Sequence, residues 1–268
     1  MPPTVSALRS DPVPASAPEW EDTIARLNNA AAGLDLPGRL AAARAAIGGR
    51  LTFTTSFGIE DQAIAHAILS QGLDFDLVTL DTGRLFAETH DVWAATEARY
   101  GVRIRAVTPE RVALEALLAG QGTNGFRDSV VARQACCHVR KVLPLKIALD
   151  GAQGWITGLR ADQSAHRAAV AFAAFDAERG LIKINPLYDW TRDDAAAFTR
   201  AHNVPVSALH ERGFLSIGCA PCTRAIQPGE PERAGRWWWE DEGKTECGLH
   251  ANPLHLAARA NFKEAKSS

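Results

Sequence analysis

The sequence predicts an α/β protein built on a doubly wound, mostly parallel sheet. From residue 50 to residue 203, short apolar runs rich in Val, Ile, Leu and Thr alternate with longer segments of helical periodicity. Repeated strand–helix units of this kind place a parallel sheet between two layers of helices. The chain has 268 residues, 46% of them hydrophobic, which suits one sizeable domain with a functional tail.

The expected elements follow in order along the chain. Two alanine-rich helical segments fill residues 19–49 and stop at Gly48 and Gly49. Apolar runs between turn residues predict strands within residues 50–58, 75–83, 102–109, 154–160 and 181–187. Apolar side chains at helical spacing predict helices within residues 59–72, 85–101, 110–122, about 128–149 and 191–203. Thr191 and Asp194 form the pattern of a capping box at the start of the last helix.

The two ends of the chain lack this alternation. Residues 1–18 are rich in Pro, Ala and Ser, which predicts a disordered N-terminal arm. The α/β domain is expected over residues 19–212. From residue 213 to residue 268, Cys, Pro, Gly, Arg and Trp accumulate without a clear period. This last part predicts a Cys-x-x-Cys segment followed by a flexible C-terminal tail.

Composition and charge argue against several classes of partner. The formal net charge of −2 indicates no surface that wraps a polyanion, so we expect no nucleic-acid partner. No stretch approaches the roughly 20 apolar residues of a membrane span, so we expect no membrane partner. The N-terminus lacks the basic region and the apolar run of a secretory signal, and we therefore expect a cytoplasmic protein. The sequence leaves a homo-oligomer open.

Three polar loops follow three predicted strands. SFGIED (residues 56–61) lies at a helix N-terminus, where backbone N–H groups and the helix dipole favour a phosphate, although it matches neither the Walker nor the Rossmann pattern. LDTGRLFAET (80–89) and TGLRADQSAHR (157–167) supply groups suited to a ribose and to phosphate or sulfate oxygens. Each alone could be an ordinary loop, but together they predict one crevice. The candidate binding residues are Ser56, Phe57, Gly58, Asp81, Thr82, Gly83, Gly158, Arg160, Ser164 and Arg167.

Four of the five cysteines form two pairs. An odd total without an export signal argues against a disulfide framework. The adjacent Cys136 and Cys137, with Cys219 and Cys222, could hold either zinc or a [4Fe–4S] cluster. An adjacent pair is an awkward clamp for one zinc ion, whereas the separate irons of a cube can each take one thiolate. The pattern therefore favours the cluster over zinc, and it favours both over ordinary buried thiols.

The fifth cysteine stands alone in KTECGLH, twenty-one residues from the end of the chain. Lys244 and His250 place positive charge near Cys247, and nearby cations lower the pKa of a thiol and increase its reactivity. A nucleophile is therefore the preferred interpretation of Cys247, and an incidental surface cysteine is the alternative.

Together, the three loops, the Cys-Cys and Cys-x-x-Cys pairs and the ECGLH tail resemble the assimilatory sulfonucleotide reductases. They are most similar to the iron–sulfur type that acts on adenosine 5′-phosphosulfate (APS). The resemblance runs from about residue 50 to His250. It implies an adenine nucleotide alpha hydrolase-like fold for a nucleotide-binding reductase domain over residues 19–212. SFGIED then resembles the family's modified phosphate loop, LDTGRL its nucleotide loop and GLRADQSAHR its arginine loop.

The resemblance also implies a thioredoxin-dependent reaction that releases sulfite and AMP. Cys247 would attack the sulfur of APS and become an S-sulfocysteine, which thioredoxin or a similar dithiol would then reduce. The family pattern adds Lys141 and His250 as catalytic residues and Arg233 and Arg236 as substrate-binding residues. Lys141 follows Cys137 by four residues, so on a helix the two would share a face. We expect the [4Fe–4S] cluster on Cys136, Cys137, Cys219 and Cys222 to act structurally and electrostatically, without changing oxidation state.

Three alternatives stay open at this stage. The first is reduction of 3′-phosphoadenosine 5′-phosphosulfate (PAPS), although enzymes dedicated to PAPS lack the four cluster cysteines. The second is an ATP-dependent thiolation enzyme of the same fold, which would need a second glycine that SFGIED lacks. The third is a zinc-binding module, which leaves the ECGLH tail without a role. None of them explains the run Trp237, Trp238 and Trp239.

Overall fold

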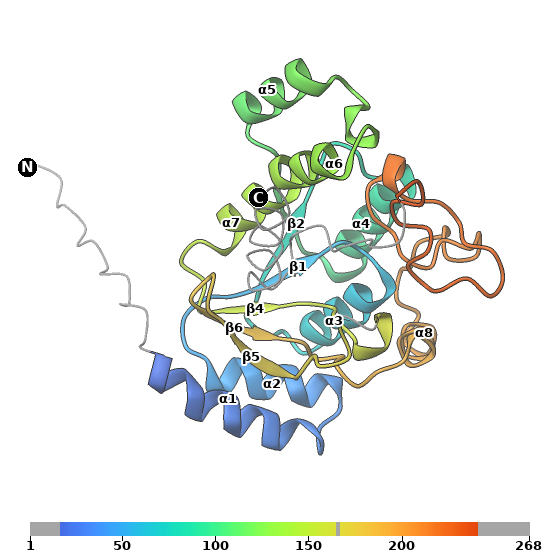
Figure 1. Ribbon diagram of the computed structural model, residues 1–268. Coiled ribbons are helices and arrows are strands. Elements are labelled where there is room, and N and C mark those ends of the chain that lie inside the picture. Colours follow the sequence, from blue (N-terminus) through green and yellow to red (C-terminus); the bar gives the residue numbers. More distant parts are fainter. Residues whose placement is uncertain (1–16, 165–166, 241–268) are drawn as a thin grey trace, which may run out of the picture.

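A six-stranded sheet with helices on both faces forms the centre of the molecule, as the computed structural model shows (Figure 1). The structure describes residues 17–164 and 167–240. The strands are β1 (Leu51–Thr55), β2 (Asp76–Leu80), β3 (Arg105–Val107), β4 (Gly154–Ile156), β5 (Ala173–Asp176) and β6 (Leu181–Ile184). The longer helices are α1 (Ala17–Ala31), α2 (Leu36–Ala46), α3 (Ile59–Ser70), α4 (Ala87–Tyr100), α5 (Arg111–Gln121), α6 (Val130–Cys137), α7 (Leu143–Leu149) and α8 (Arg192–Ala201).

The strand order is β3-β2-β1-β4-β6-β5, and every neighbouring pair is parallel except β5 and β6. The predicted doubly wound, mostly parallel sheet is confirmed. The chain runs outward from β1 to β2 and β3, then returns and continues on the other side of β1 at β4. This reversal leaves a crevice beyond the carboxyl ends of β1 and β4, which is where ligands bind in open α/β sheets.

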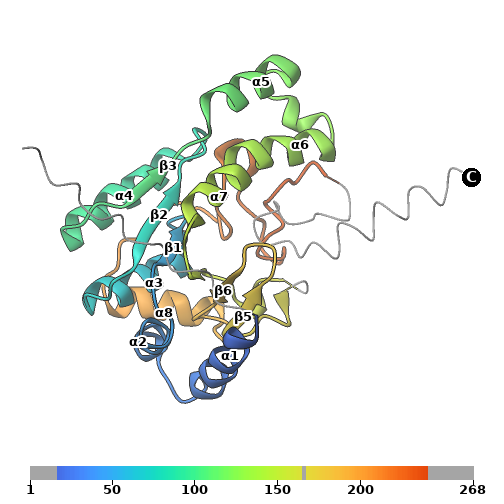
Figure 2. The same ribbon diagram turned by 90° about the vertical axis from the view of Figure 1, so that its left-hand side faces the viewer.

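Side chains of the central strands are buried on both faces of the sheet. Ile156 in β4 packs with Leu40 of α2 and Ile64 of α3, whereas its neighbour Trp155 packs with Leu145 of α7. Successive residues of a strand point to opposite faces, so a strand covered on both sides has no polar face. Figure 2 shows α1 and α2 below the sheet and α7 on its other side. The helices thus fix the sheet rigidly beneath the crevice.

The edge strand β5 was not predicted. Its sequence Ala-Ala-Phe-Asp lacks the β-branched residues that mark a strand, and only its first residue is buried. It forms through an antiparallel hairpin with β6, closed by a turn in which Gly180 has φ of 66°. Pairing with β6 therefore makes residues 173–176 a strand, although their own β propensity is low.

The single helix predicted over residues 128–149 is interrupted. One turn of π-helix, η2 (His138–Val142), separates α6 from α7. Pro144 lies in the first turn of α7, and because proline has no N–H to donate, it breaks the regular hydrogen-bond ladder at this point. The predicted capping box at α8 is present: Asp194 N donates to Thr191 Oγ1 at 3.1 Å, and Thr191 N donates to an Asp194 carboxylate oxygen at 2.8 Å.

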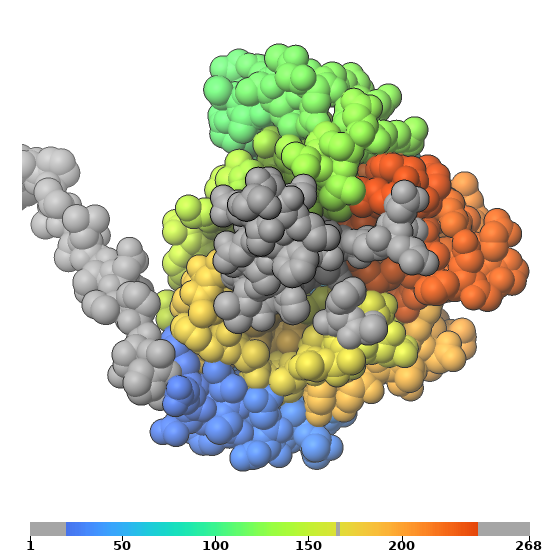
Figure 3. All heavy atoms as spheres, in the orientation of Figure 1, coloured from blue at the N-terminus to red at the C-terminus, as the bar shows by residue number. Residues whose placement is uncertain are grey.

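The segment from residue 213 to residue 240 has little regular structure and packs on the domain (Figure 3). Ala220 N donates to Arg84 O at 2.8 Å, and Trp237 N donates to Cys222 O at 3.2 Å. In Figure 3 the orange-red atoms of this segment adjoin the green atoms of the α5–α6 region. Residues 241–268 of the predicted tail and residues 1–16 of the predicted arm lie outside the described residues. None of the helices in the described parts of the chain combines the length and apolarity of a bilayer span.

Candidate active site

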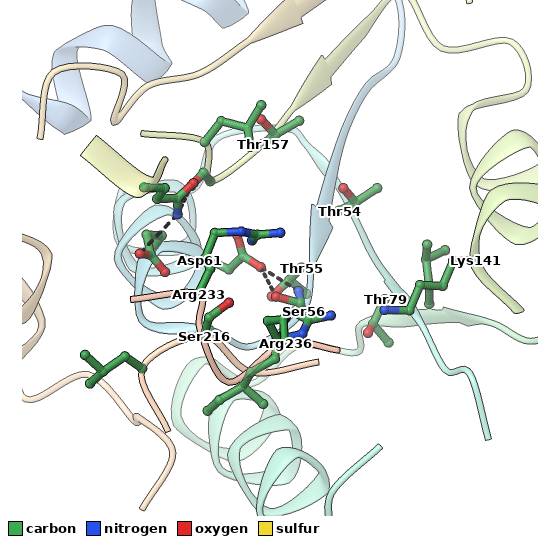
Figure 4. Close-up of a pocket in the computed structure, with 18 of the residues that line it drawn as sticks. Thr54, Thr55, Ser56, Asp61, Thr79, Lys141, Thr157, Ser216, Arg233 and Arg236 are labelled. Carbon is green, nitrogen blue, oxygen red and sulfur yellow. Dashed lines mark hydrogen bonds between the residues drawn. The ribbon is translucent and has the colours of Figure 1, made fainter. Parts of the chain in front are cut away.

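A cavity of about 200 Å³ opens at the crevice between β1, β2 and β4 (Figure 4). Thr55 at the end of β1, Thr79 in β2 and Thr157 just after β4 line it, together with Arg233 and Arg236 from the C-terminal segment. The α/β domain and the segment after residue 213 therefore both contribute side chains to the cavity. Its position matches the ligand crevice expected of a doubly wound sheet.

In the SFGIED loop, the Asp61 carboxylate in the first turn of α3 accepts hydrogen bonds from Ser56. Ser56 donates from N and Oγ to Asp61 Oδ2, at 2.6 and 2.8 Å. Burial raises the pKa of the Asp61 carboxyl to about 6, although the two hydrogen bonds from Ser56 oppose the rise. Phe57 adopts φ of 59°, a left-handed conformation that is costly for a residue with a side chain. That turn buries Phe57 against Trp93, with ring centroids 5.6 Å apart, and leaves Ser56 and Gly58 lining the cavity.

The LDTGRL loop connects the cavity to the cysteines. Thr82 lines the cavity, and its Oγ1 lies 3.3 Å from Cys219 Sγ. Asp81 and Gly83 do not line the cavity. Asp81 Oδ1 accepts from Gly83 N at 2.9 Å, and Gly83 has φ of 67° in the left-handed region, so the two residues shape the turn that presents Thr82.

In the arginine loop, Arg160 is fully buried and paired with carboxylates. Its guanidinium donates to Glu60 at 3.0 Å and to Glu232 at 2.8 Å. Arg160 thereby holds the start of α3 against the C-terminal segment, and its side chain does not line the cavity. Burial raises the pKa of Glu232, although the charge of Arg160 opposes the rise. Ser164 also lies outside the lining residues, whereas Gly158 and Arg167 belong to them.

Four cationic side chains among the described residues line the cavity, and they come from three separate segments of the sequence. Figure 4 shows Lys141 entering from the η2 side and Arg233 and Arg236 entering from the C-terminal segment. The fourth is Arg167 in the arginine loop. Three carboxylates among the described residues also line it: Glu60 and Glu232 pair with Arg160, and Asp61 accepts from Ser56. Several cations in a partly enclosed space form a strong site for a multiply charged anion.

The four paired cysteines converge in the structure although 81 residues separate the two pairs. They line one small cavity next to the larger one, and Lys141 lines both. Lys141 lies in the π-turn, so its spacing from Cys137 is not that of the regular helix that the sequence predicted. Three arginines also line this small cavity, Arg84, Arg133 and Arg140, as do Phe126 and Pro221.

Burial acts against the charged forms of these thiols. It raises the pKa of Cys222 to about 12, and the neighbouring thiols Cys219 and Cys137 add to the rise. The pKa of Cys219 is nevertheless lowered, because the charge of Lys141 and the hydrogen bond from Thr82 outweigh its burial. Such a site accepts four thiolates most readily when a positively charged centre binds them.

No three His, Cys, Asp or Glu side chains among the described residues are grouped closely enough to hold one metal ion. A polynuclear centre has a different requirement, because each of its metal atoms needs only one thiolate from the protein. The chemistry of the donors, four thiols surrounded by cations, fits a centre of that kind with a net negative charge. Cys247 and His250 lie outside the described residues.

Three further residues at the site were missed by the sequence prediction. Glu232 and Trp237 line the cavity, but their partners lie far away in sequence and no local pattern reveals them. His210 also lines the cavity, and its Nδ1 lies 2.9 Å from Phe214 O. Its Nε2 is buried without a hydrogen-bond partner among the described residues, and burial lowers the pKa of the ring. The lowered pKa favours the neutral imidazole of His210.

Comparisons with known proteins agree on one family. The model of the phosphoadenosine phosphosulfate reductase domain matches residues 50–225. A protein of Agrobacterium fabrum named adenosine 5′-phosphosulfate reductase is 59% identical over 226 residues, covering 84% of this chain and 86% of that protein. A protein of Allochromatium vinosum with the same name is 50% identical and covers 75% and 78%. The crystal structure of a phosphoadenylyl-sulfate reductase from Candida auris superposes with a TM-score of 0.64 at 25% identity, covering 76% of this chain and 96% of that one.

The buried Asp61 carboxyl generates a prediction on pH. Its folded pKa of about 6 exceeds the ordinary aspartate pKa of 3.8, so the stability it contributes is present below about pH 4 and lost as pH rises through 6. Two pKa units correspond to roughly 3 kcal/mol. We expect the unfolding free energy of the wild type, relative to Asp61→Asn, to fall by about 2–3 kcal/mol between pH 4 and pH 7 in urea denaturation.

Asp189→Asn is the matched control for this measurement. A hydrogen bond from Arg39 lowers the pKa of Asp189, so its contribution is present above pH 4 and lost as pH falls. The two variants should therefore give opposite slopes against pH. A flat profile for Asp61→Asn relative to the wild type contradicts the buried carboxyl.

Proposed function

The chain belongs to the phosphoadenosine phosphosulfate reductase family, and from that membership we propose that it reduces APS to sulfite and AMP with electrons from a protein dithiol. The choice of substrate is supported by relatives that are 45–59% identical and carry the name adenosine 5′-phosphosulfate reductase. The chain covers 86% of the first of these relatives, so the comparison spans nearly the whole protein.

One observation supports the proposal most strongly: Lys141 lines both the cation-rich cavity and the cavity of the four cysteines. APS carries a sulfate joined to a phosphate, and its charge suits a site built from one lysine and several arginines. We assign the phosphosulfate to Lys141, Arg167, Arg233 and Arg236. The nucleotide part would lie over the ends of β1, β2 and β4, against Ser56, Gly58, Thr82 and Gly158.

The remaining predicted binding residues take supporting roles in this proposal. Phe57 packs in the core and forces the turn at Ser56, while Asp81 and Gly83 shape the turn that presents Thr82. Arg160 holds Glu232 directly before Arg233, so it orients a cationic residue without needing to touch the substrate. Ser164 stays a predicted contact in the arginine loop.

Sulfonate transfer to Cys247 is the first chemical step. The thiolate of Cys247 attacks the sulfur of APS, a sulfur–sulfur bond forms, and the bond from sulfur to the phosphate oxygen breaks. AMP leaves with the bonding electron pair and needs no proton, because its phosphate is a weak base. The cations around the cavity stabilise the negative charge that builds on the leaving oxygen. His250, three residues after the nucleophile, is assigned to the same step.

Reduction of the S-sulfocysteine is the second step. One thiolate of thioredoxin, or of a similar dithiol, attacks Sγ of Cys247 and expels sulfite with the electron pair. The second thiol then attacks the mixed disulfide and releases Cys247 as a thiolate. The dithiol loses two electrons and the sulfur gains two, so no other redox partner is needed. Cys247 therefore meets the substrate first and an external protein second.

We further propose that Cys136, Cys137, Cys219 and Cys222 hold a [4Fe–4S] cluster. When bound, the cluster supplies a fixed charge beside Lys141 and ties α6 to the C-terminal segment, and the transfer of electrons does not pass through it. Arg140 Nη1 donates to Thr82 O at 2.6 Å, and Thr82 Oγ1 contacts Cys219 Sγ. Thr82 and Arg140 would therefore orient the Cys219 ligand.

Steady-state sulfite release tests the choice of substrate. We expect kcat/KM for APS to exceed that for PAPS at least about tenfold, a difference of ~1.4 kcal/mol in the transition state, with thioredoxin as reductant. Cys247→Ser gives the background rate for both substrates. Equal kcat/KM values, or a preference for PAPS, contradict the proposal.

Iron and acid-labile sulfide content test the cluster. Protein purified without air should contain both in equal amounts, and Cys219→Ser should lose most of the iron, because a thiolate ligand is removed. Cys247→Ser is the matched control and should retain wild-type iron. Full iron in Cys219→Ser, or zinc in the wild type, argues against the cluster.

A further inference from the structure

A buried ion pair joins α6 to the last residue of the described C-terminal segment. Arg133 Nε donates to Glu240 Oε1 at 2.5 Å, and Arg133 Nη2 donates to Glu240 Oε2 at 3.1 Å. The side chain of Arg133 is 0% exposed and that of Glu240 is 5% exposed. Two parallel hydrogen bonds between a guanidinium and a carboxylate fix the orientation of both groups, as well as their separation.

The ring of Trp237 lies between this pair and the substrate cavity. The Arg133 guanidinium carbon lies 4.4 Å from the ring centroid, and that of Arg236 lies 4.9 Å from it. Trp237 is 2% exposed and has φ of 46°, a strained conformation for a residue with a side chain. Glu240 N donates to Trp237 O at 2.9 Å and closes a tight turn. Residues 236–240 therefore form one compact unit held on both sides.

The other end of this unit lies in the cation-rich cavity. Arg236 lines the cavity, and its side chain passes so close to Gly218 that a Cβ there would lie 2.3 Å from a guanidinium nitrogen. Gly218 is thus needed for the path of Arg236. One short unit of five residues consequently links a proposed sulfate-binding arginine to Glu240.

We propose that the Arg133–Glu240 pair anchors the catalytic tail, fixing the point from which the segment carrying Cys247 leaves the domain. The inference rests on the proposed function of Cys247. Glu240 and Cys247 are 247 − 240 = 7 residues apart, so the nucleophile stays within about 25 Å of the anchor, at ~3.6 Å per residue. Fixing the root of a short tether raises the effective concentration of the thiolate at the bound substrate.

Stability alone is a poor explanation of this pair. A buried ion pair is often no more stabilising than apolar side chains of similar size, because both charges lose their hydration. The two hydrogen bonds from Arg133, in contrast, fix the orientation of Glu240, which suits a role in positioning the chain that follows it. Arg39 and Asp189 form another two-pronged arginine–carboxylate pair, in which Arg39 is 5% and Asp189 40% exposed, and neither residue lines the cavity. That pair serves as a control.

Single-turnover sulfonate transfer tests the anchor. Protein, APS and no thiol are mixed, and the S-sulfonated form of Cys247 is followed by mass spectrometry of quenched samples. Glu240→Gln should slow transfer at saturating APS at least about tenfold while AMP affinity stays within about twofold. Arg133→Lys, which keeps the charge but loses the fork, should retain an intermediate rate. Asp189→Asn should transfer at the wild-type rate even where it lowers thermal stability.

The outcomes separate the anchor from the proposed function. If the wild type transfers sulfonate to Cys247 and Glu240→Gln does so at the same rate, the anchor is wrong and the function stands. If Glu240→Gln and Asp189→Asn lose rate equally, the pair acts only through stability and the anchor is again wrong. If the wild type forms no adduct on Cys247, the proposed function fails and the anchor fails with it.

Discussion

The buried contacts of Arg160 with Glu60 and Glu232 are the interaction on which the site depends. A cation-rich cavity must bring like charges together, and fixed carboxylates behind it offset their repulsion. Arg160 reaches Glu232 from the loop after β4, and Glu232 directly precedes the cavity residue Arg233. Removing one partner of such a buried cluster costs about 3–5 kcal/mol, because a charge is then left without compensation. The arginine loop and the C-terminal segment are therefore one structural unit.

Carboxylates hold the C-terminal segment at both ends of its functional stretch. Glu232 precedes Arg233 and pairs with Arg160, and Glu240 follows Arg236 and pairs with Arg133. Arg233 and Arg236 thus lie in the chain between two buried ion pairs, one to the loop after β4 and one to α6. Lys141 approaches from η2, beside the four cysteines. In the proposed function, this arrangement holds the cations of the anion site in place.

The sequence predicted those features that depend on short-range pattern. Strand–helix alternation gave the parallel sheet, and the spacing of Thr191 and Asp194 gave the cap of α8. The hairpin strand β5 and the break at η2 were missed, because pairing to β6 and the missing N–H of Pro144 decide them. Sequence reasoning predicted that Arg160 binds the ligand, and this stays a prediction; what the sequence did not reveal is that its side chain pairs with Glu60 and Glu232. The sequence shows that Arg160 is charged, but it does not show that its partner is Glu232, 72 residues away.

One measurement tests directly whether sulfonate is transferred from APS to Cys247. The protein is incubated with APS and without any thiol, and its intact mass and the AMP released are both determined. We expect one sulfonate per chain, located on Cys247 by peptide mapping, and one AMP for each sulfonate. Release of AMP without a protein adduct, or an adduct on any other residue, would contradict it.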